Sequence, residues 1–338
     1  MRALVLSATA PIETAPLRLD ARPTPVPGPG EILVRVSACG VCRTDLHIVE
    51  GELPPVRASI VPGHQIVGRI ERTGSGARRF ALGDRVGIAW LRGTCGVCEA
   101  CRSGRENLCE RAVFTGYHAD GGFADYAVVP EAFAYAIPPV FGDAEAAPLL
   151  CAGIIGYRAL ALSEVKPGGR LGLYGFGASA HVTLQVARAR GCEVFVCTRE
   201  ESHRALARRL GATWVGGIRD VMPAKMHGTI LFAPVGELVP VALENLDRGG
   251  TLALAGIYMT AVPPLEYERD LFYERTIRSV TANTRTDGEE LLAEAARIPI
   301  RTAVTTFPLE EANRALALLK RGGFAGAGVL LTGEGSRV

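Results

Sequence analysis

Short apolar runs separated by turn residues characterise the chain up to about residue 150. Runs at 31–37, 66–72 and 85–89 alternate with turn signals rich in Gly and Pro, such as 27–30 and 73–76. Short strands that end in frequent turns are typical of antiparallel sheets. This part of the chain is therefore predicted to form a β-rich lobe.

From about residue 170 the pattern changes to apolar strands that alternate with helical stretches. The predicted strands lie at 171–174, 193–197, 229–232 and 251–255. The predicted helices between them lie at 178–190, 203–210 and 238–245. Such βαβ alternation is typical of a parallel sheet. Beyond residue 284 we expect two more helices and a final strand that returns to the first lobe, at 288–297, 309–321 and 328–332.

The composition argues against several classes of protein. The 338 residues are 48% hydrophobic and 21% charged, which is enough material for two domains with separate cores. A formal net charge of +2, without runs of like charge, gives no sign of a nucleic-acid or membrane partner. The strand-like opening run at 1–6 is too short for a signal peptide, and no apolar run approaches the roughly 20 residues that cross a bilayer. We therefore expect a cytoplasmic protein, in which nine cysteines favour metal binding over disulfides.

Four closely spaced cysteines follow the pattern C-x2-C-x2-C-x7-C; they are Cys95, Cys98, Cys101 and Cys109. Four thiolates at this spacing can close a tetrahedral zinc site that leaves no position for substrate, so the role of such a site is structural. An iron–sulfur cluster takes the same four ligands. The spacing alone predicts a bound metal without choosing between the two.

Three further segments contain residues that could bind a catalytic metal. The segment 40–47 holds a thiol, a hydroxyl, a carboxylate and an imidazole, and the other two contain His64 and Cys151. A catalytic zinc needs three protein ligands and one open position, and Cys with His suits it. Taken singly, His64 also fits a turn residue and Cys151 a small buried hydrophobe. Spacing cannot connect sites that lie so far apart in the sequence.

A glycine-rich turn at 175–180, of the form G-x-G-x-x-A, links the first strand of the second half to its helix. Gly175 permits a tight turn, Gly177 lets the backbone approach a pyrophosphate, and Ala180 allows close packing of helix on strand. The helix that begins at Ala178 offers N–H groups and a partial positive charge to phosphates. Between a strand and a helix, this motif predicts a dinucleotide site.

These motifs, in this order, resemble the medium-chain zinc-dependent alcohol dehydrogenase family. The matching segments are G-x-C-R-T-D-x-H at 40–47, G-H at 63–64, the four cysteines, G-G-F-A-D-Y at 121–126 and the glycine turn. The resemblance covers essentially the whole chain. It implies an α/β protein with a GroES-like β-rich catalytic domain that binds zinc and a Rossmann cofactor domain with a doubly wound parallel sheet. Their implied bounds are 1–151 with 285–338, and 152–284.

The resemblance also assigns metal ligands. The catalytic zinc ligands of the family fall on Cys42, His64 and Cys151, and its structural zinc ligands fall on the four clustered cysteines. Zinc is therefore favoured over an iron–sulfur cluster, and two zinc ions per chain are implied. Cys39 does not match a ligand, because the family's ligand directly precedes R-[ST]-D and that position is Cys42.

Three residues near these ligands match further family positions, and a fourth departs from one. Asp45 resembles the carboxylate that orients the ligand histidine through its second ring nitrogen. Thr44 resembles the hydroxyl of a proton relay and His47 its terminal imidazole, whose ordinary pKa of about 6.5 suits exchange with solvent. Gln65 departs from the family, which usually has Glu there. Because Gln keeps the size and one acceptor oxygen but loses the charge, we expect activity to persist.

The residues after the second strand of the βαβ region bear on the choice of cofactor. NAD-binding members usually have an acidic residue there, whereas this chain has Thr198 followed by Arg199. A carboxylate would repel a 2′-phosphate, while Thr and Arg can receive one, so NADP(H) is favoured over NAD(H). The alternative is that Arg199 is a solvated surface residue and NAD binds through Thr198. Arg43 matches a basic family position near the pyrophosphate, but 326–328 lacks the family's C-terminal cofactor-binding Arg.

The activity implied by the resemblance is interconversion of primary alcohols and aldehydes by hydride transfer to or from the nicotinamide cofactor. The alternative in the same superfamily is a polyol or sugar dehydrogenase, which often has Glu in place of Cys151. A zinc-free quinone reductase lacks both cysteine sets. A zinc-ribbon nucleic-acid binder built around 95–109 is disfavoured by the glycine turn and by the lack of a basic stripe. The resemblance further implies a homodimer or homotetramer.

Overall fold

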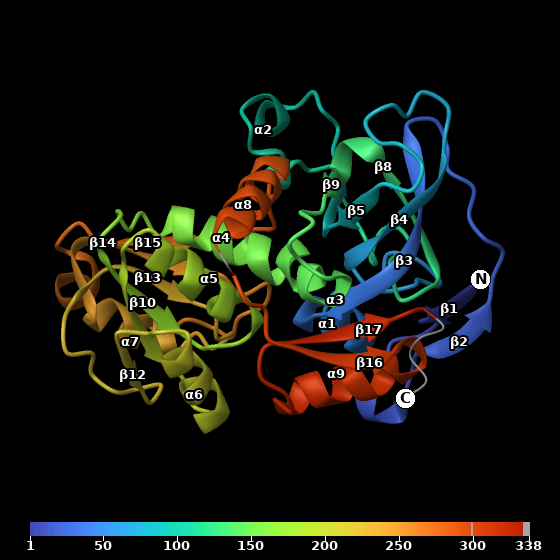
Figure 1. Ribbon diagram of the computed structural model, residues 1–338. Helices are drawn as coiled ribbons and strands as arrows, with labels where there is room; N and C mark the ends of the chain where they lie inside the picture. The colour runs from blue at the N-terminus through green and yellow to red at the C-terminus, as the bar shows by residue number, and fades with distance from the viewer. Residues whose placement is uncertain (299, 334–338) are drawn as a thin grey trace. The chain divides into compact units, whose positions relative to one another are not determined.

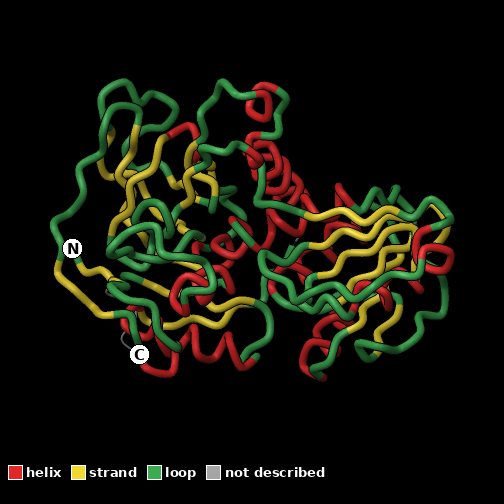
Figure 2. The backbone as a smooth tube through the Cα atoms, turned by 180° about the vertical axis from the view of Figure 1, so that it is seen from behind, coloured by secondary structure: helices red, strands yellow, loops and turns green. Residues whose placement is uncertain are grey.

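The computed structural model describes residues 1–298 and 300–333, which form two compact units. The first unit contains Met1–Cys151, Asn283–Ala296 and the segment that begins at Thr302, and the second contains Ala152–Ala282 and Arg297–Arg301. The chain therefore leaves the first unit after Cys151 and returns to it at Asn283. Figure 1 and Figure 2 show the elements from opposite sides.

A seven-stranded sheet forms the centre of the first unit. The strand order is β16-β17-β3-β4-β5-β9, with β8 paired to β3. Only the β16–β17 pair is parallel among these described strands. Figure 1 shows the red strands β16 and β17 beside the blue strand β3, so the end of the chain does return to the first lobe. The bounds are Glu31–Val41 (β3), Gln65–Thr73 (β4), Arg85–Ile88 (β5), Tyr126–Pro130 (β8), Ala134–Ala136 (β9), Val304–Pro308 (β16) and Ala327–Leu331 (β17).

The central strand β3 confirms the run predicted at 31–37 and extends it to Val41. Ile32, Leu33 and Val34 are fully buried. A strand that is covered on both faces carries a continuous apolar run instead of strict alternation, and β-branched residues suit it. The length of β3 matters for the site, because its last residue directly precedes Cys42.

Two small hairpins and several short helices complete the first unit. The hairpins are formed by β1 with β2 and by β6 with β7. Their bounds are Arg2–Val5, Arg18–Ala21, Leu91–Gly93 and Val113–Phe114. The α-helices are α1 (Arg43–Glu50), α2 (Glu99–Arg102), α3 (Asp143–Ala146), α8 (Arg285–Arg297) and α9 (Ala312–Arg321). The 3-10 turns are η1 (Ile12–Thr14), η2 (Glu106–Leu108), η3 (Glu131–Phe133), η4 (Ala147–Leu150) and η6 (Leu309–Glu311).

Helix α8 begins three residues before the start predicted at 288, because a reciprocal cap extends it. The Asp287 N–H donates to Thr284 Oγ1 at 3.1 Å, and the Thr284 N–H donates to Asp287 Oδ2 at 2.7 Å. Such a pair satisfies two backbone donors that have no partner within the helix. The predicted helix at 309–321 becomes α-helical only at Ala312, after a 3-10 turn that follows Pro308.

The second unit contains a six-stranded parallel sheet. Its order is β12-β11-β10-β13-β14-β15, and every adjacent pair of these strands is parallel. The order reverses between β10 and β13, and doubly wound sheets bind ligands at the carboxyl ends of strands at such a point. The bounds are Arg170–Tyr174 (β10), Glu193–Cys197 (β11), Trp214–Gly216 (β12), Met226–Leu231 (β13), Leu246–Leu254 (β14) and Thr276–Ser279 (β15).

Helices flank this sheet, with α4 (Ala152–Leu162) packed against α5 (Ala178–Ala189). The others are α6 (Glu201–Arg209) and α7 (Leu238–Glu244), with a π-helical turn η5 at Tyr267–Leu271. Apolar residues of α7 join those of four strands in one buried cluster. Figure 2 shows these strands in yellow, side by side. The predicted parallel sheet is thus confirmed.

Two strands and one α-helix of the second unit were not predicted from the pattern of apolar and polar residues. Strand β12 is only three residues long, and β15 is a mostly exposed edge strand in which Ile277 is the only strongly apolar residue. Helix α4 is apolar on most of its surface and therefore lacks the polar face that identifies an amphipathic helix. In the described residues no single helix is long and apolar enough to span a membrane; one bent pair, Asp143–Leu150 with Ala152–Leu162, could do so by length and composition alone.

Candidate metal centres and cofactor site

Three residues that are far apart in the sequence meet at one edge of the first unit's sheet. Strand β3 ends at Val41, directly before Cys42, and β4 begins at Gln65, directly after His64. Because these strands are antiparallel, with Gly40 opposite Gln65, the two candidate ligands emerge at the same end. Cys151 follows η4, which packs against β3 and β4.

The ligand atoms of this group have the spacing of a tetrahedral metal site. The Sγ atoms of Cys42 and Cys151 lie 3.9 Å apart, and His64 Nε2 lies 3.3 Å from Cys151 Sγ. Around a zinc ion with Zn–S bonds of about 2.3 Å and Zn–N bonds of about 2.0 Å, two sulfurs lie about 3.8 Å apart and a sulfur and a nitrogen about 3.5 Å apart. The residues therefore fit zinc. With three protein ligands, one position is left for an oxygen of a substrate or of water.

A buried carboxylate holds two of these ligands in place. Asp45 is fully buried in α1, and its Oδ1 accepts hydrogen bonds from His64 Nδ1 at 2.9 Å and from the Gly63 N–H at 3.0 Å. Its Oδ2 accepts the Cys42 N–H at 2.9 Å. Because Nδ1 donates to Asp45, Nε2 is the ring nitrogen that can lose its proton and bind a metal. Asp45 therefore lies where the sequence analysis expected the orienting carboxylate.

The loop that carries His64 needs glycine for steric reasons. Gly63 has φ +94°, and a Cβ at this position would lie 2.5 Å from the Phe123 ring and 2.9 Å from Cys39 Sγ. The segment 121–123 also donates backbone N–H groups to the carbonyls of Val61, Gly63 and Pro62 at 2.7, 2.9 and 2.9 Å. The G-G-F-A-D-Y motif therefore has a structural role: its backbone hydrogen bonds hold the loop that positions His64.

The charges around the three ligands favour a bound cation. Burial alone would lower the pKa of His64, but Asp45 and then Cys42 outweigh it and raise the pKa to about 10. The Cys42 pKa is held well below its ordinary value by the hydrogen bond from Cys151, and His64 acts in the same direction against burial. The Cys151 pKa is raised by the Cys42 sulfur and by burial. The site thus stores negative charge in a buried place, which a divalent cation would compensate.

Replacing Asp45 with Asn is expected to lower the affinity of one metal ion about ten- to hundredfold. Asn keeps the size, but with its amide oxygen toward Gly63 and His64 its NH2 group would oppose the Cys42 N–H, which now donates at 2.9 Å. Competition with a chromogenic chelator measures the two zinc affinities separately. Asp20→Asn, at a half-exposed side chain, serves as the control. Unchanged zinc affinity in Asp45→Asn would contradict the role of this carboxylate.

The four clustered cysteines also form a compact group. Their Sγ atoms all lie within 4.8 Å of one another, with 3.9 Å between Cys95 and Cys101 and 3.5 Å between Cys98 and Cys101. Backbone N–H groups of Val97 and Cys98 lower the pKa of Cys95 to about 5, whereas the pKa of Cys98 is raised to about 11 by neighbouring sulfurs and burial, against a backbone hydrogen bond. These distances fit a tetrahedral zinc with four sulfur ligands and no open position.

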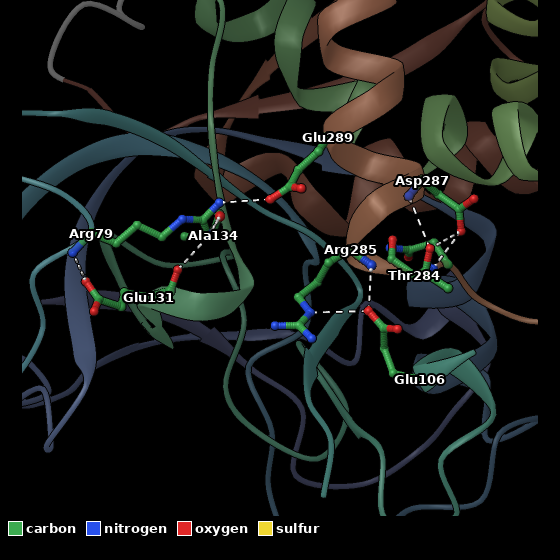
Figure 3. A network of polar contacts seen from close by, with 9 residues as sticks. Arg79, Glu106, Glu131, Ala134, Thr284, Arg285, Asp287 and Glu289 are labelled. Carbon is green, nitrogen blue, oxygen red and sulfur yellow. Dashed lines mark hydrogen bonds and ion pairs between the residues drawn. The ribbon is translucent and has the colours of Figure 1, made fainter. Parts of the chain in front are cut away.

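A polar network attaches the cysteine lobe to the first unit (Figure 3). Glu106, in η2 between two of the cysteines, is 6% exposed and accepts hydrogen bonds from the Arg285 N–H at 3.1 Å and from Arg285 Nε at 3.2 Å. Burial raises the pKa of Glu106, but the hydrogen bonds from Arg285 outweigh it and the pKa falls below its ordinary value. Arg79 makes a second link to α8. Its backbone N–H donates to the Glu131 carboxylate, and its guanidinium donates to the carboxylate of Glu289 in α8. The lobe is therefore joined to the start of α8 by a charged contact that is buried at Glu106 and partly exposed at Arg285.

The predicted relay residues lie on α1. Thr44 is 7% exposed, and its hydroxyl lies 3.7 Å from Cys42 Sγ. His47 is 9% exposed, and its Nδ1 contacts the Glu52 carboxylate. Sequence reasoning missed Glu52, although a Glu directly after the helix-ending Gly51 was a local signal that could have indicated it.

Two other residues that the sequence analysis discussed lie near the ligands. Cys39 is fully buried and stands outside the group of three, with its pKa raised well above the ordinary value, chiefly by burial. Gln65 is 2% exposed and lies against Gly40 of the neighbouring strand, where a Cβ would be 2.8 Å from its Oε1. Trp90 packs edge-on against His64 with ring centroids 5.0 Å apart, and it stacks with Phe114 at 4.8 Å. Trp90 and Phe114 therefore form an aromatic wall beside His64.

The glycine turn of the second unit connects β10 to α5. Gly175 has φ +87°, and its N–H donates to the Cys197 carbonyl at 2.8 Å. A Cβ at Gly175 would lie 3.0 Å from the Ala233 nitrogen, whereas the space beside Gly177 is open. Ala178 is the first residue of α5, and Ala180, in the first turn of the same helix, is fully buried. The turn lies at the carboxyl end of β10, next to the reversal of strand order, so it can hold a pyrophosphate.

The predicted cofactor-selecting residues follow β11. Thr198 is 2% exposed, and its carbonyl accepts Arg204 Nε at 3.2 Å. The Arg199 side chain is 76% exposed, and its guanidinium lies 3.5 Å from the Glu200 carboxylate. Arg43, which was predicted to contact the pyrophosphate, is the first residue of α1 and belongs to the first unit.

Comparison with known proteins identifies the family. Residues 28–139 match the model of the alcohol dehydrogenase GroES-like domain, and residues 180–297 match that of zinc-binding dehydrogenases. The probable alcohol dehydrogenase AdhA of Mycobacterium tuberculosis is 54% identical over 95% of this chain and 94% of its own length.

Two solved structures have the same fold. A cinnamyl alcohol dehydrogenase of Sorghum bicolor has a TM-score of 0.88 and 26% identity, with 97% of this chain and 96% of that one covered. A cobalt- and zinc-bound thermostable alcohol dehydrogenase of Pyrobaculum aerophilum has a TM-score of 0.87 and 26% identity over 98% of this chain and 99% of that one. The predicted GroES-like and Rossmann fold is confirmed, and the chain belongs to the medium-chain zinc-dependent alcohol dehydrogenase family.

Proposed function

We propose that this chain is a zinc-dependent alcohol dehydrogenase that interconverts primary alcohols and aldehydes, with NADP(H) as the preferred hydride carrier. The observation that carries the proposal is the buried group of Cys42, His64 and Cys151, whose ligand atoms have tetrahedral spacing and are held by Asp45. Its family membership and the alcohol dehydrogenases among its relatives support the same activity over polyol oxidation.

Residues of the first unit would have separate roles in alcohol oxidation. Cys42, His64 and Cys151 would hold the catalytic zinc, which when bound supplies a Lewis acid for the alcohol oxygen. Thr44 and His47 would carry the proton of the alcohol toward solvent. Trp90, whose ring packs edge-on against His64, would exclude water beside that ligand. Cys95, Cys98, Cys101 and Cys109 would hold the second, structural zinc.

The cofactor would lie on the second unit. The turn with Gly175, Gly177, Ala178 and Ala180 would receive the pyrophosphate at the N-terminus of α5. Thr198 and the exposed Arg199 would receive the ribose and its 2′-phosphate. Arg43 would add a positive charge for the pyrophosphate. When bound, the cofactor would supply the hydride chemistry through its nicotinamide ring.

We expect a higher kcat/KM with NADPH than with NADH. Arg199→Ala should raise the KM for NADPH about tenfold and leave that for NADH nearly unchanged, because one charged hydrogen bond to phosphate is worth roughly 1.5 to 3 kcal/mol. Arg209→Ala removes the same charge from the exposed end of α6 and is the matched control. Initial rates with both cofactors measure the effect. A clear preference of the unmodified protein for NADH would contradict the role of Arg199.

We also propose the domain and cellular arrangement that the family suggests. The catalytic domain would comprise 1–151 with 285–338, of which 334–338 lie outside the described residues, and the cofactor domain 152–284. The protein would act in the cytoplasm as a homodimer or homotetramer, on small-molecule substrates and without a nucleic-acid or membrane partner.

A panel of aliphatic, allylic and aromatic primary alcohols, their aldehydes and a polyol, each with NADP(H) and NAD(H), tests the proposed function. Metal analysis of the same preparation should give about two zinc ions per chain. Turnover of primary alcohols well above that of the polyol is the expected result. Preferential polyol oxidation, or turnover that is independent of zinc, would overturn the proposal.

A further inference from the structure

Glu52 is the carboxylate that contacts the ring of His47. The Glu52 Oε2 atom lies against His47 Nδ1. When the imidazole ring is protonated, the two side chains form an ion pair. The His47 side chain is 11% exposed, whereas that of Glu52 is 45% exposed. The pair therefore joins a nearly buried imidazole to a carboxylate that water reaches.

The end of α1 places Glu52 at this position. The helix ends at Glu50, and Gly51 takes the left-handed conformation with φ +81°. The Gly51 N–H donates to the Ile48 carbonyl at 3.3 Å, and the Leu53 N–H donates to the His47 carbonyl at 3.2 Å. This turn folds the chain back over the last helical turn, as left-handed caps do. The contact of Glu52 with His47 thus follows from backbone geometry as well as from charge.

Several other charged groups near α1 have partners of their own, and Arg43 is the first residue of the helix. On α1, Asp45 binds His64, and Glu50 accepts hydrogen bonds from Lys320 Nζ at 2.8 Å and from the Ile12 N–H at 2.9 Å. The elements with the most extensive packing against α1 are α9 and η1. Their charged side chains are Glu13 of η1, which pairs with Lys320, and Arg314, Lys320 and Arg321 of α9. The contact of the Glu52 carboxylate with the His47 ring is established by geometry.

We propose that Glu52 is a positioning residue of the proton relay, which sets the tautomer and orientation of His47. A carboxylate at Nδ1 selects the neutral ring with a proton on Nδ1, so that Nε2 carries the lone pair. During alcohol oxidation Nε2 then accepts the proton that leaves the alcohol by way of the Thr44 hydroxyl. The resulting imidazolium is stabilised by Glu52 and returns one proton to water, so each turnover releases one proton with one aldehyde and one reduced cofactor. This inference rests on the proposed alcohol dehydrogenase activity.

Two variants separate orientation from charge. Glu52→Ala removes the acceptor, and Glu52→Gln keeps an acceptor oxygen without the charge. We expect nitrogen-15 NMR of histidine-labelled, zinc-loaded protein to find the Nδ1–H tautomer of His47 in the unmodified chain, with the signal assigned by His47→Gln. The Nδ1–H population should fall in Glu52→Ala and be largely retained in Glu52→Gln. Glu268→Gln, an exposed glutamate of the second unit, is the control that removes the same charge elsewhere.

Kinetics give the functional readout. In Glu52→Ala the kcat for alcohol oxidation should fall about tenfold at low pH with little change in KM, because a misplaced base slows proton transfer and leaves binding intact. The double variant Glu52→Ala/His47→Ala should be no slower than His47→Ala alone, since the two residues act as one unit. Glu52→Asp should recover part of the rate.

The outcomes distinguish this inference from the proposed function. Glu52→Ala with an unchanged His47 tautomer and an unchanged pH profile, beside an impaired His47→Ala, would overturn the role of Glu52 alone. An unimpaired His47→Ala would overturn the relay together with this inference. Lack of alcohol turnover by the unmodified, zinc-loaded protein would instead overturn the proposed function, and the NMR readout would still report on the contact between Glu52 and His47.

Discussion

Replacing Cys151 with Ser is expected to remove one of two zinc ions and to lower kcat/KM for alcohol oxidation at least about a thousandfold. A serine hydroxyl stays protonated near neutral pH and is a poor ligand for zinc, whereas a thiolate is a strong one. A bound Lewis acid is worth several kcal/mol to the transition state, and about 1.4 kcal/mol corresponds to a factor of ten in rate. Metal analysis and initial rates measure both effects on the same sample.

Cys39→Ser is the matched control for this experiment. Cys39 is a buried thiol of the same strand end, but it lies outside the group of Cys42, His64 and Cys151 and is close enough to donate to the Gly40 carbonyl, at 3.7 Å. A serine can donate in its place, so the control should keep both zinc ions and its rate. If Cys151→Ser keeps two zinc ions, or if Cys39→Ser loses one, the ligand assignment is wrong.

Replacing Cys98 with Ser is expected to remove the other zinc ion and to lower the melting temperature by about 10 °C. The cysteine lobe has little apolar core to hold it: α2 contains no buried residue, and Val97 and Leu108 are 57% and 48% exposed. Metal binding must therefore supply much of the stability of this lobe. In a protein of this size, a loss of a few kcal/mol moves the melting temperature by roughly this amount.

The structure also indicates which segment outside the cysteine lobe Cys98→Ser should destabilise. Because Glu106 of the lobe binds both the backbone and the side chain of Arg285, hydrogen exchange should quicken at the first turn of α8. Ser103→Ala, an exposed substitution in the same lobe, is the control and should leave zinc content and melting temperature unchanged. A Cys98→Ser protein with two zinc ions and an unchanged melting temperature would contradict a structural metal at this lobe.

Local features of the fold and of the candidate sites could be predicted from the sequence. The four clustered cysteines lie close enough along the chain to surround one ion, so their pattern predicts a metal before any fold is known. The strands β10 and β11 and the helix α5 follow from the alternation of apolar and helical stretches, because each such element buries its own apolar face. The glycine turn between β10 and α5 is equally local, since its conformation depends on adjacent residues.

The catalytic group depends on long-range contacts that only the tertiary structure decided. Cys42 and His64 meet because β3 and β4 pair with Gly40 opposite Gln65, and a strand register is set by the burial of whole faces, which no single residue encodes. A resemblance to known enzymes suggested this group, but the sequence alone could not bring its members together. The partners of Asp45 and the return of Glu52 to His47 likewise depend on a helix start and a left-handed cap. Local chemistry was thus readable from the chain, whereas the geometry that makes it a site arose from packing.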